Sequence, residues 1–438
     1  MATATSSLSV QMEAARGRLP TYLVVLLSVQ VFCTFLTETK FIAELKNNIG
    51  AFEVSGLILF VVAFDYFLHQ QLPIRTHPVM RWLGVMALVA TLSLLQLTPD
   101  RQWNGIVAYV LLLSSLAFTL TLYNVITLHE QYFVRLMRAI GYAVGVIALW
   151  LLADSIQSGG QVNAAGPFRN RAHASVYMFT SFWILLLNLS WPGTTRRQWW
   201  TFTAILPLAL YCVMVGGRRS VYLSLLVGLV GLALGFIVSR ARAQFKLLTP
   251  FVVSLIAVGL FYFVLSEFWY PAQFFRQRVG MVSSRIEMAT ARSAEDVEND
   301  FMLQQRAGVL DAFRDHPVLG IGWGGFYRSV YSRTGHEVHS TPMRFLAETG
   351  LLGLLAYTMF MGCLLWRSLR LWWLSRRSDF ELSSLILCLA LWSLSVSYVY
   401  NRQMTDRTFW LMLVVFISYE TIVLNRHRRA RWFREQAV

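Results

Sequence analysis

Charged residues are scarce in this 438-residue chain, at 14% of the total, while hydrophobic residues make up 56%. Apolar runs of about 18 residues or more recur along the sequence, and a soluble core needs no runs of that length. The composition therefore excludes an ordinary soluble domain. It predicts an all-α polytopic membrane protein.

Twelve apolar runs are candidates for membrane-spanning helices. The run at 346–366, which has a polar start, and the pair between 199 and 238 have the least distinct boundaries. The predicted spans cover residues 20–37, 50–69, 79–97, 103–128, 135–156, 173–191, 199–216, 219–238, 246–266, 346–366, 381–400 and 405–425.

Cysteine is rare as well. Cys33, Cys212, Cys363 and Cys388 all lie inside apolar runs, where thiols act as small packing residues. This usage excludes a disulfide framework and a metal–thiolate site. The sequence also lacks the glycine-rich fingerprints of nucleotide-binding sites, so we expect no cofactor.

Acidic residues are fewer than basic ones, 23 against 38, which gives a formal net charge of +15. The excess of arginine follows the termini and alternate loops, a pattern that places those loops in the cytoplasm by the positive-inside rule. Insertion polarity explains the charge, so we expect no nucleic-acid partner. The basic groups that define this side include Arg75 and Arg81, Arg135 and Arg138, Arg196 and Arg197, Arg376 and Arg377, and the arginines after Arg426.

One connection is much longer than the others. Residues 267–345 contain nine Arg and nine Asp or Glu, and long connections of this kind are usually functional. We predict three parts: transmembrane helices 1–9 in residues 1–266, a periplasmic loop domain at 267–345, and helices 10–12 with a basic cytoplasmic tail at 346–438.

The long loop contains a helix signal followed by a glycine cluster. AEDVENDFMLQQRAGVLDAFRDH has apolar residues near helical spacing, and Pro317 ends the pattern. HPVLGIGWGGF then supplies four glycines, which permit tight backbone turns. This cluster is either a structural turn or a direct substrate contact.

Several arginines on the outer side run against the positive-inside trend. They lie in GPFRNRAHAS, in GGRRS and between the last two runs. A guanidinium pairs with phosphate oxygens in a bidentate way and stays charged near a membrane, which suits a lipid phosphate or pyrophosphate. The alternative is that these side chains are snorkelling anchors. The residues are Arg169 and Arg171, Arg218 and Arg219, and Arg402 and Arg407.

His339 precedes the run that contains the tenth span. One interpretation is a histidine at a helix start, with Ser340 or Thr341 as N-cap and Pro342 in the first turn. The other is a general base at the outer surface, kept neutral by nearby arginines. A metal site with His316, His336 and Glu337 matches no standard ligand spacing.

A resemblance to a family joins these elements. His339-Ser340, nine residues, then Gly350-Leu351-Leu352-Gly353 resembles the signature of the bacterial O-antigen ligase family, which also includes O-antigen polymerases and protein O-oligosaccharyltransferases. HPVLGIGWGGF, GRRS and GPFRNRAHAS resemble further elements of that family. Arg219 matches the arginine of the G-S-R-G turn, and Arg306 falls where an upstream arginine is common. Ala172 replaces an asparagine of the family pattern, so the GPFRNRAHAS element is assigned no detailed role.

The resemblance implies an inverting, metal-independent membrane glycosyltransferase without cofactor. Its donor would be a glycan on undecaprenyl pyrophosphate, and its acceptor a sugar hydroxyl of lipid A-core in lipopolysaccharide biosynthesis. His339 would be catalytic, Arg219, Arg218, Arg306, Arg169 and Arg171 would bind the donor, and Ser340, Gly350 and Gly353 would complete the motif. The enzyme would lie in the bacterial inner membrane with its site facing the periplasm. A polymerase or protein-glycosylating relative is a near alternative, and a lipid or anion transporter is a distant one.

Overall fold

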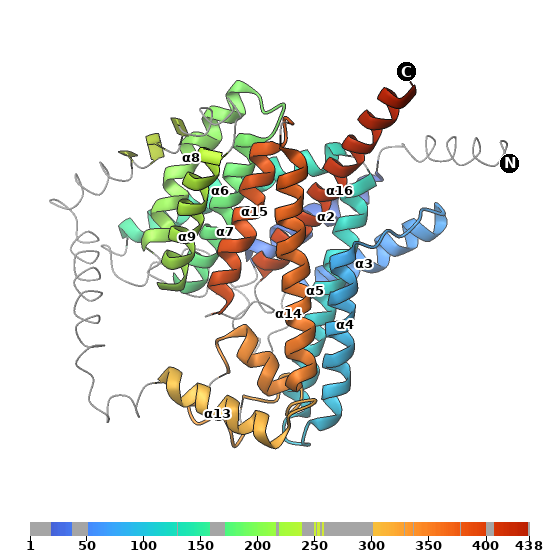
Figure 1. Ribbon diagram of the computed structural model, residues 1–438, viewed down its shortest axis with the longest axis vertical. Coiled ribbons are helices and arrows are strands. Elements are labelled where there is room, and N and C mark those ends of the chain that lie inside the picture. Colours follow the sequence, from blue (N-terminus) through green and yellow to red (C-terminus); the bar gives the residue numbers. More distant parts are fainter. Residues whose placement is uncertain are drawn as a thin grey trace.

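The structure is a computed structural model, shown in Figure 1. It describes residues 19–36, 51–128, 130–157, 171–215, 219–238, 249–257 without 251 and 255, and 301–436 without 328, 336, 377 and 400–406. Over these residues the chain forms helices and turns and no strand, which confirms the predicted all-helical class.

The helices follow the predicted apolar runs closely. The ninth run, 246–266, falls mostly outside the described residues, and the twelve-span count stays a prediction. The described helices are α2 (Thr21–Leu36), α3 (Ala51–His69), α4 (Pro78–Ser93), the short 3-10 helix η2 (Leu94–Gln96), α5 (Gln102–Leu128), α6 (Glu130–Gln157), α7 (Arg171–Ser190), α8 (Arg196–Val215), α9 (Arg219–Val238), α13 (Phe301–Asp315), α14 (Thr341–Ser375), α15 (Glu381–Val399) and α16 (Arg407–Gln436).

Seven of the described helices are long and apolar enough to cross a membrane, and three further apolar helices have shorter described stretches. α15 and α16 are mostly buried and form the centre of the bundle, where α15 packs between α14 and α9 and α16 packs on α5. On α14, exposed Leu351, Leu355, Met359, Trp366 and Trp373 repeat at helical spacing. Exposed apolar stripes of this kind face lipid, so the fold fits a polytopic membrane protein.

One end of the bundle gathers the basic loops. Arg426 of α16 forms an ion pair with Glu130 at the start of α6, Arg138 donates to Gly193 O, and Arg376 donates to Val238 O. We call this the basic end. Because α7 and α9 terminate there, both helices begin at the opposite end, where α14 also begins (Figure 1).

A buried polar cluster near the basic end joins three helices. His77 Nδ1 accepts from Val79 N, so its proton is on Nε2, which donates to Glu420 Oε2 of α16 over 2.9 Å. Arg367 of α14 lies 2.7 Å from Glu420 Oε1. A buried carboxylate needs such partners, and these contacts tie the start of α4 to α14 and α16.

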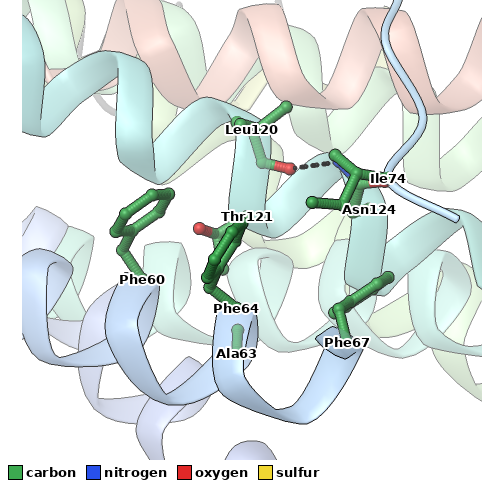
Figure 2. Close-up of a pocket in the computed structure, with 8 residues that line it drawn as sticks. All are labelled: Phe60, Ala63, Phe64, Phe67, Ile74, Leu120, Thr121 and Asn124. Atoms are coloured by element: carbon green, nitrogen blue, oxygen red, sulfur yellow. Dashed lines mark hydrogen bonds between the residues drawn. The ribbon is translucent and has the colours of Figure 1, made fainter. Parts of the chain in front are cut away.

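A shallow apolar recess lies between α3 and α5 (Figure 2). Its wall includes Phe60, Phe64 and Phe67, and also Asn124, whose Nδ2 donates to Leu120 O and Arg75 O. Asn124 is 22 residues after Gln102, which opens α5. At 1.5 Å per residue this separation is about 33 Å. A Cβ on Gly105, near the start of α5, would lie 2.9 Å from Trp323 O of the glycine cluster, so the recess lies far from that cluster.

Candidate active site

The His339 region lies at the end of the bundle opposite the basic end. α13 runs across the lower end of α14 in Figure 1, and segment 316–340 connects the two helices. We call α13, this segment and residues 341–353 the outer layer. Its core combines Val309 and Ala312 of α13 with Ile321 and Phe326 of the glycine cluster, Val338 and Ala347.

α13 confirms the helix predicted before Pro317, but its buried face differs from the apolar pattern. Val309 is fully buried, whereas Leu310 is 48% exposed. The reason is close packing at Gly308, where a Cβ would lie 2.0 Å from Tyr331 O. The loop packs on the face of α13 that carries Gly308. The spacing of apolar residues does not indicate where such a close backbone contact forms.

Polar contacts between α13 and the following loop support this packing. Tyr331 Oη donates to Asp315 Oδ2 over 2.6 Å, and Arg333 pairs with Asp311. The hydrogen bond to the Asp315 carboxylate raises the pKa of Tyr331 above its ordinary value. The phenol therefore stays protonated and keeps the loop attached to α13.

α14 is interrupted at Gly350, which has φ 65° and ψ −157°. In a continuous helix, Leu351 N and Leu352 N would donate to Ala347 O and Glu348 O. Here they donate to Pro317 O and Val318 O instead. The two carbonyls freed on α14 accept from Ile321 N and Gly322 N, each at 3.0 Å. The glycine cluster thus replaces the helix bonds that Gly350 breaks.

The motif glycines therefore have structural roles. A Cβ at Gly350 would lie 2.4 Å from Val318 O, and one at Gly353 would overlap the Thr349 hydroxyl. Gly320, Gly322 and Gly324 all have positive φ, which favours the interpretation of the cluster as a turn. Gly350 and Gly353 of the motif thus lie where the preceding loop packs against α14.

A buried ion pair holds the loop against α14. Arg344 Nε donates to Glu348 Oε2 over 2.9 Å, and Gly324 N donates to the same oxygen. The Arg344 guanidinium lies over the Trp323 ring, 5.0 Å from its centroid. Both ionic side chains are buried, and removing one partner of such a pair costs about 3–5 kcal/mol. The four-residue spacing is a recognisable helix-pair signal, yet the sequence prediction did not include this pair.

His339 lies two residues before the first residue of α14. Ser340 is the N-cap, with φ −78° and ψ 122°, and Pro342 lies in the first turn, as the sequence predicts. Ser340 makes no side-chain capping hydrogen bond. The His339 side chain is half-buried. α14 begins five residues before the predicted span at 346, because this cap signal lies in the polar segment ahead of the apolar run.

The structure places some of the predicted arginines and not others. Arg306 is exposed on α13, on a different face from its buried neighbour Gln305. Arg171 and Arg219 open α7 and α9, at the same end of the bundle as His339, and the structure describes their backbone but not their side chains. Arg169, Arg218 and Arg402 lie outside the described residues, as does His336 of the rejected metal site.

Among the residues that the structure describes, no group of three His, Cys, Asp or Glu side chains could hold a metal ion. Metal independence stays a prediction.

The fold and the outer layer define a helical membrane protein whose candidate site lies at the end of a membrane helix. Residues 202–358 match the family model described as O-antigen ligase. The match contains α13, the glycine cluster, His339, Gly350 and Gly353, so it confirms the resemblance over these motifs and supports an enzymatic role. Comparison with curated proteins found no match.

Proposed function

We propose that the protein is an O-antigen ligase, which transfers a glycan from undecaprenyl pyrophosphate to a sugar hydroxyl of lipid A-core with inversion at the anomeric carbon. The observation that supports this proposal most is the family match at residues 202–358, which contains the complete outer layer. Donor, acceptor and membrane lipids would meet at the end of the bundle where His339 lies.

The reaction assigns a role to each predicted group. The His339 imidazole accepts the proton of the acceptor hydroxyl, whose oxygen attacks the anomeric carbon while the bond to pyrophosphate breaks. Arg219 and Arg218, with Arg169, Arg171 and Arg306, bind the pyrophosphate and stabilise its charge as it leaves. The shared end of α7, α9 and α14 supports this grouping. No cofactor or metal is assigned.

An assay with purified components tests the proposal. The protein in lipid nanodiscs should transfer a glycan from the lipid pyrophosphate to lipid A-core, and EDTA should change the rate by less than about twofold, because arginines provide the positive charge. A large loss restored by Mg²⁺ or Mn²⁺ would contradict the mechanism. Lengthening of the donor glycan would identify a polymerase, and transfer to a protein acceptor would identify a protein-glycosylating enzyme.

Orientation is tested separately. We propose that the protein lies in the bacterial inner membrane, with segment 267–345 between the two transmembrane parts and facing the periplasm. Val330, 83% exposed in the outer layer, should react as Val330→Cys with an impermeant thiol reagent in intact spheroplasts. Arg197→Cys at the basic end should react only after lysis. The unmutated protein gives the background from native cysteines, and the reverse pattern would reject the orientation.

A further inference from the structure

Gln305 is a buried polar residue of α13, with 4% of its surface exposed. Its Nε2 donates to Glu337 O over 2.8 Å, and its Oε1 accepts from His339 N over 3.4 Å. The two bonds lie on either side of Val338, which is itself buried. One side chain therefore holds the backbone immediately before the predicted catalytic histidine.

The chemistry of the partners fixes the orientation of this amide. A backbone carbonyl only accepts and a backbone N–H only donates, so a flipped amide would satisfy neither Glu337 O nor His339 N. The Gln305 amide makes the same two bonds that the backbone of a residue in a neighbouring parallel β-strand would make. One goes to the carbonyl before Val338 and the other comes from the N–H after it. Glutamine is the side chain that offers both functions at this length without a charge.

The same short segment is also held from α14. Arg344 N donates to Ser340 O over 2.9 Å, the first bond of the helix. His339 thus lies between two fixed points, Gln305 on α13 and the N-cap Ser340 on α14. These contacts set the position of the histidine backbone.

We propose that Gln305 is a positioning residue that holds His339 in the geometry required for proton abstraction, an inference that rests on the function proposed above. Gln305 touches no reacting atom and acts through the His339 backbone. A displacement of about 1 Å in a catalytic group can cost about a hundredfold in rate. Loss of the clamp should therefore lower turnover and leave substrate binding intact.

Kinetics of two variants test this role. Gln305→Met keeps the side-chain length and removes both bonds, and Leu310→Met on the exposed side of α13 is the matched control. Gln305→Met should lower kcat about ten- to a hundredfold with KM for both substrates within about twofold, whereas Leu310→Met should retain the wild-type kcat. Amide exchange in the peptide containing residues 337–340 should accelerate in Gln305→Met alone.

The double variant separates positioning from general support of the fold. If Gln305 acts through His339, Gln305→Met should add little to the loss caused by His339→Ala. Additive losses, an unchanged kcat, or a lower Tm with normal kcat per folded enzyme would overturn the proposal. Absence of transfer by the wild type would instead refute the proposed function, and the positioning role with it, whereas the exchange rates would still report whether the clamp exists.

Discussion

His339→Ala should reduce glycan transfer to a small residual rate while the protein stays folded and still binds the lipid-pyrophosphate donor. General-base assistance contributes roughly a hundred- to ten-thousandfold to a rate and little to ground-state binding. The measurement is the single-turnover rate together with donor affinity, both in the same nanodiscs. Normal transfer by the variant would remove the assignment of His339 as the base.

Ser340→Ala is the matched control for this variant. Ser340 is adjacent to His339, and its side chain makes no capping hydrogen bond, so its loss should cost well under the roughly 1 kcal/mol typical of a working N-cap. A similar loss of transfer in both variants would indicate that the segment was disturbed as a whole.

Variants of Arg219 should show a different combination of kinetic and binding defects from His339→Ala. If its guanidinium binds the pyrophosphate, Arg219→Ala should weaken donor binding and turnover together. Arg219→Lys should recover only part, because an ammonium keeps the charge but loses the bidentate geometry. Full activity in Arg219→Lys would favour a snorkelling anchor.

The sequence predicted the parts of the fold that depend on local signals. Apolar runs located the helices of the bundle, and Ser340 with Pro342 located the start of α14. These features follow from residues close together in the chain: a membrane helix satisfies its own backbone bonds, and a cap uses its own first turn.

The arrangement of the outer layer depended on contacts that are distant in sequence. Gln305 holds a segment more than 30 residues away, and no local pattern distinguishes it from Gln304. The family motif pointed to Gly350 without showing why glycine is there, since the exchanged bonds to Pro317 and Ile321 appear only in the folded chain. The roles of Gln305 and Gly350 depend on their burial and on their hydrogen-bond partners, and hydrophobic periodicity reports neither.

Gly350→Ala should destabilise the protein and remove transfer activity. The backbone at Gly350, with φ 65° and ψ −157°, lies in a region that is essentially restricted to glycine. An added Cβ would also lie 2.4 Å from Val318 O and 2.8 Å from Gly320 N. These are backbone atoms of the loop that replaces the helix bonds, so the loop must shift. We expect a loss on the order of 3 kcal/mol.

Gly362→Ala in the same helix should have the opposite sign. Gly362 has ordinary helical geometry, and a Cβ there would meet nothing within 4 Å. Alanine is favoured over glycine in a helix interior by roughly 0.5–1 kcal/mol, so Gly362→Ala should keep or raise the Tm and retain transfer. The two variants carry the same glycine-to-alanine substitution in the same helix. They differ only in the backbone conformation of the glycine and in the space around the added Cβ. Equal Tm values for the two variants would show that α14 is continuous through Gly350. In that case the glycine cluster would not pair with the helix in the way described above.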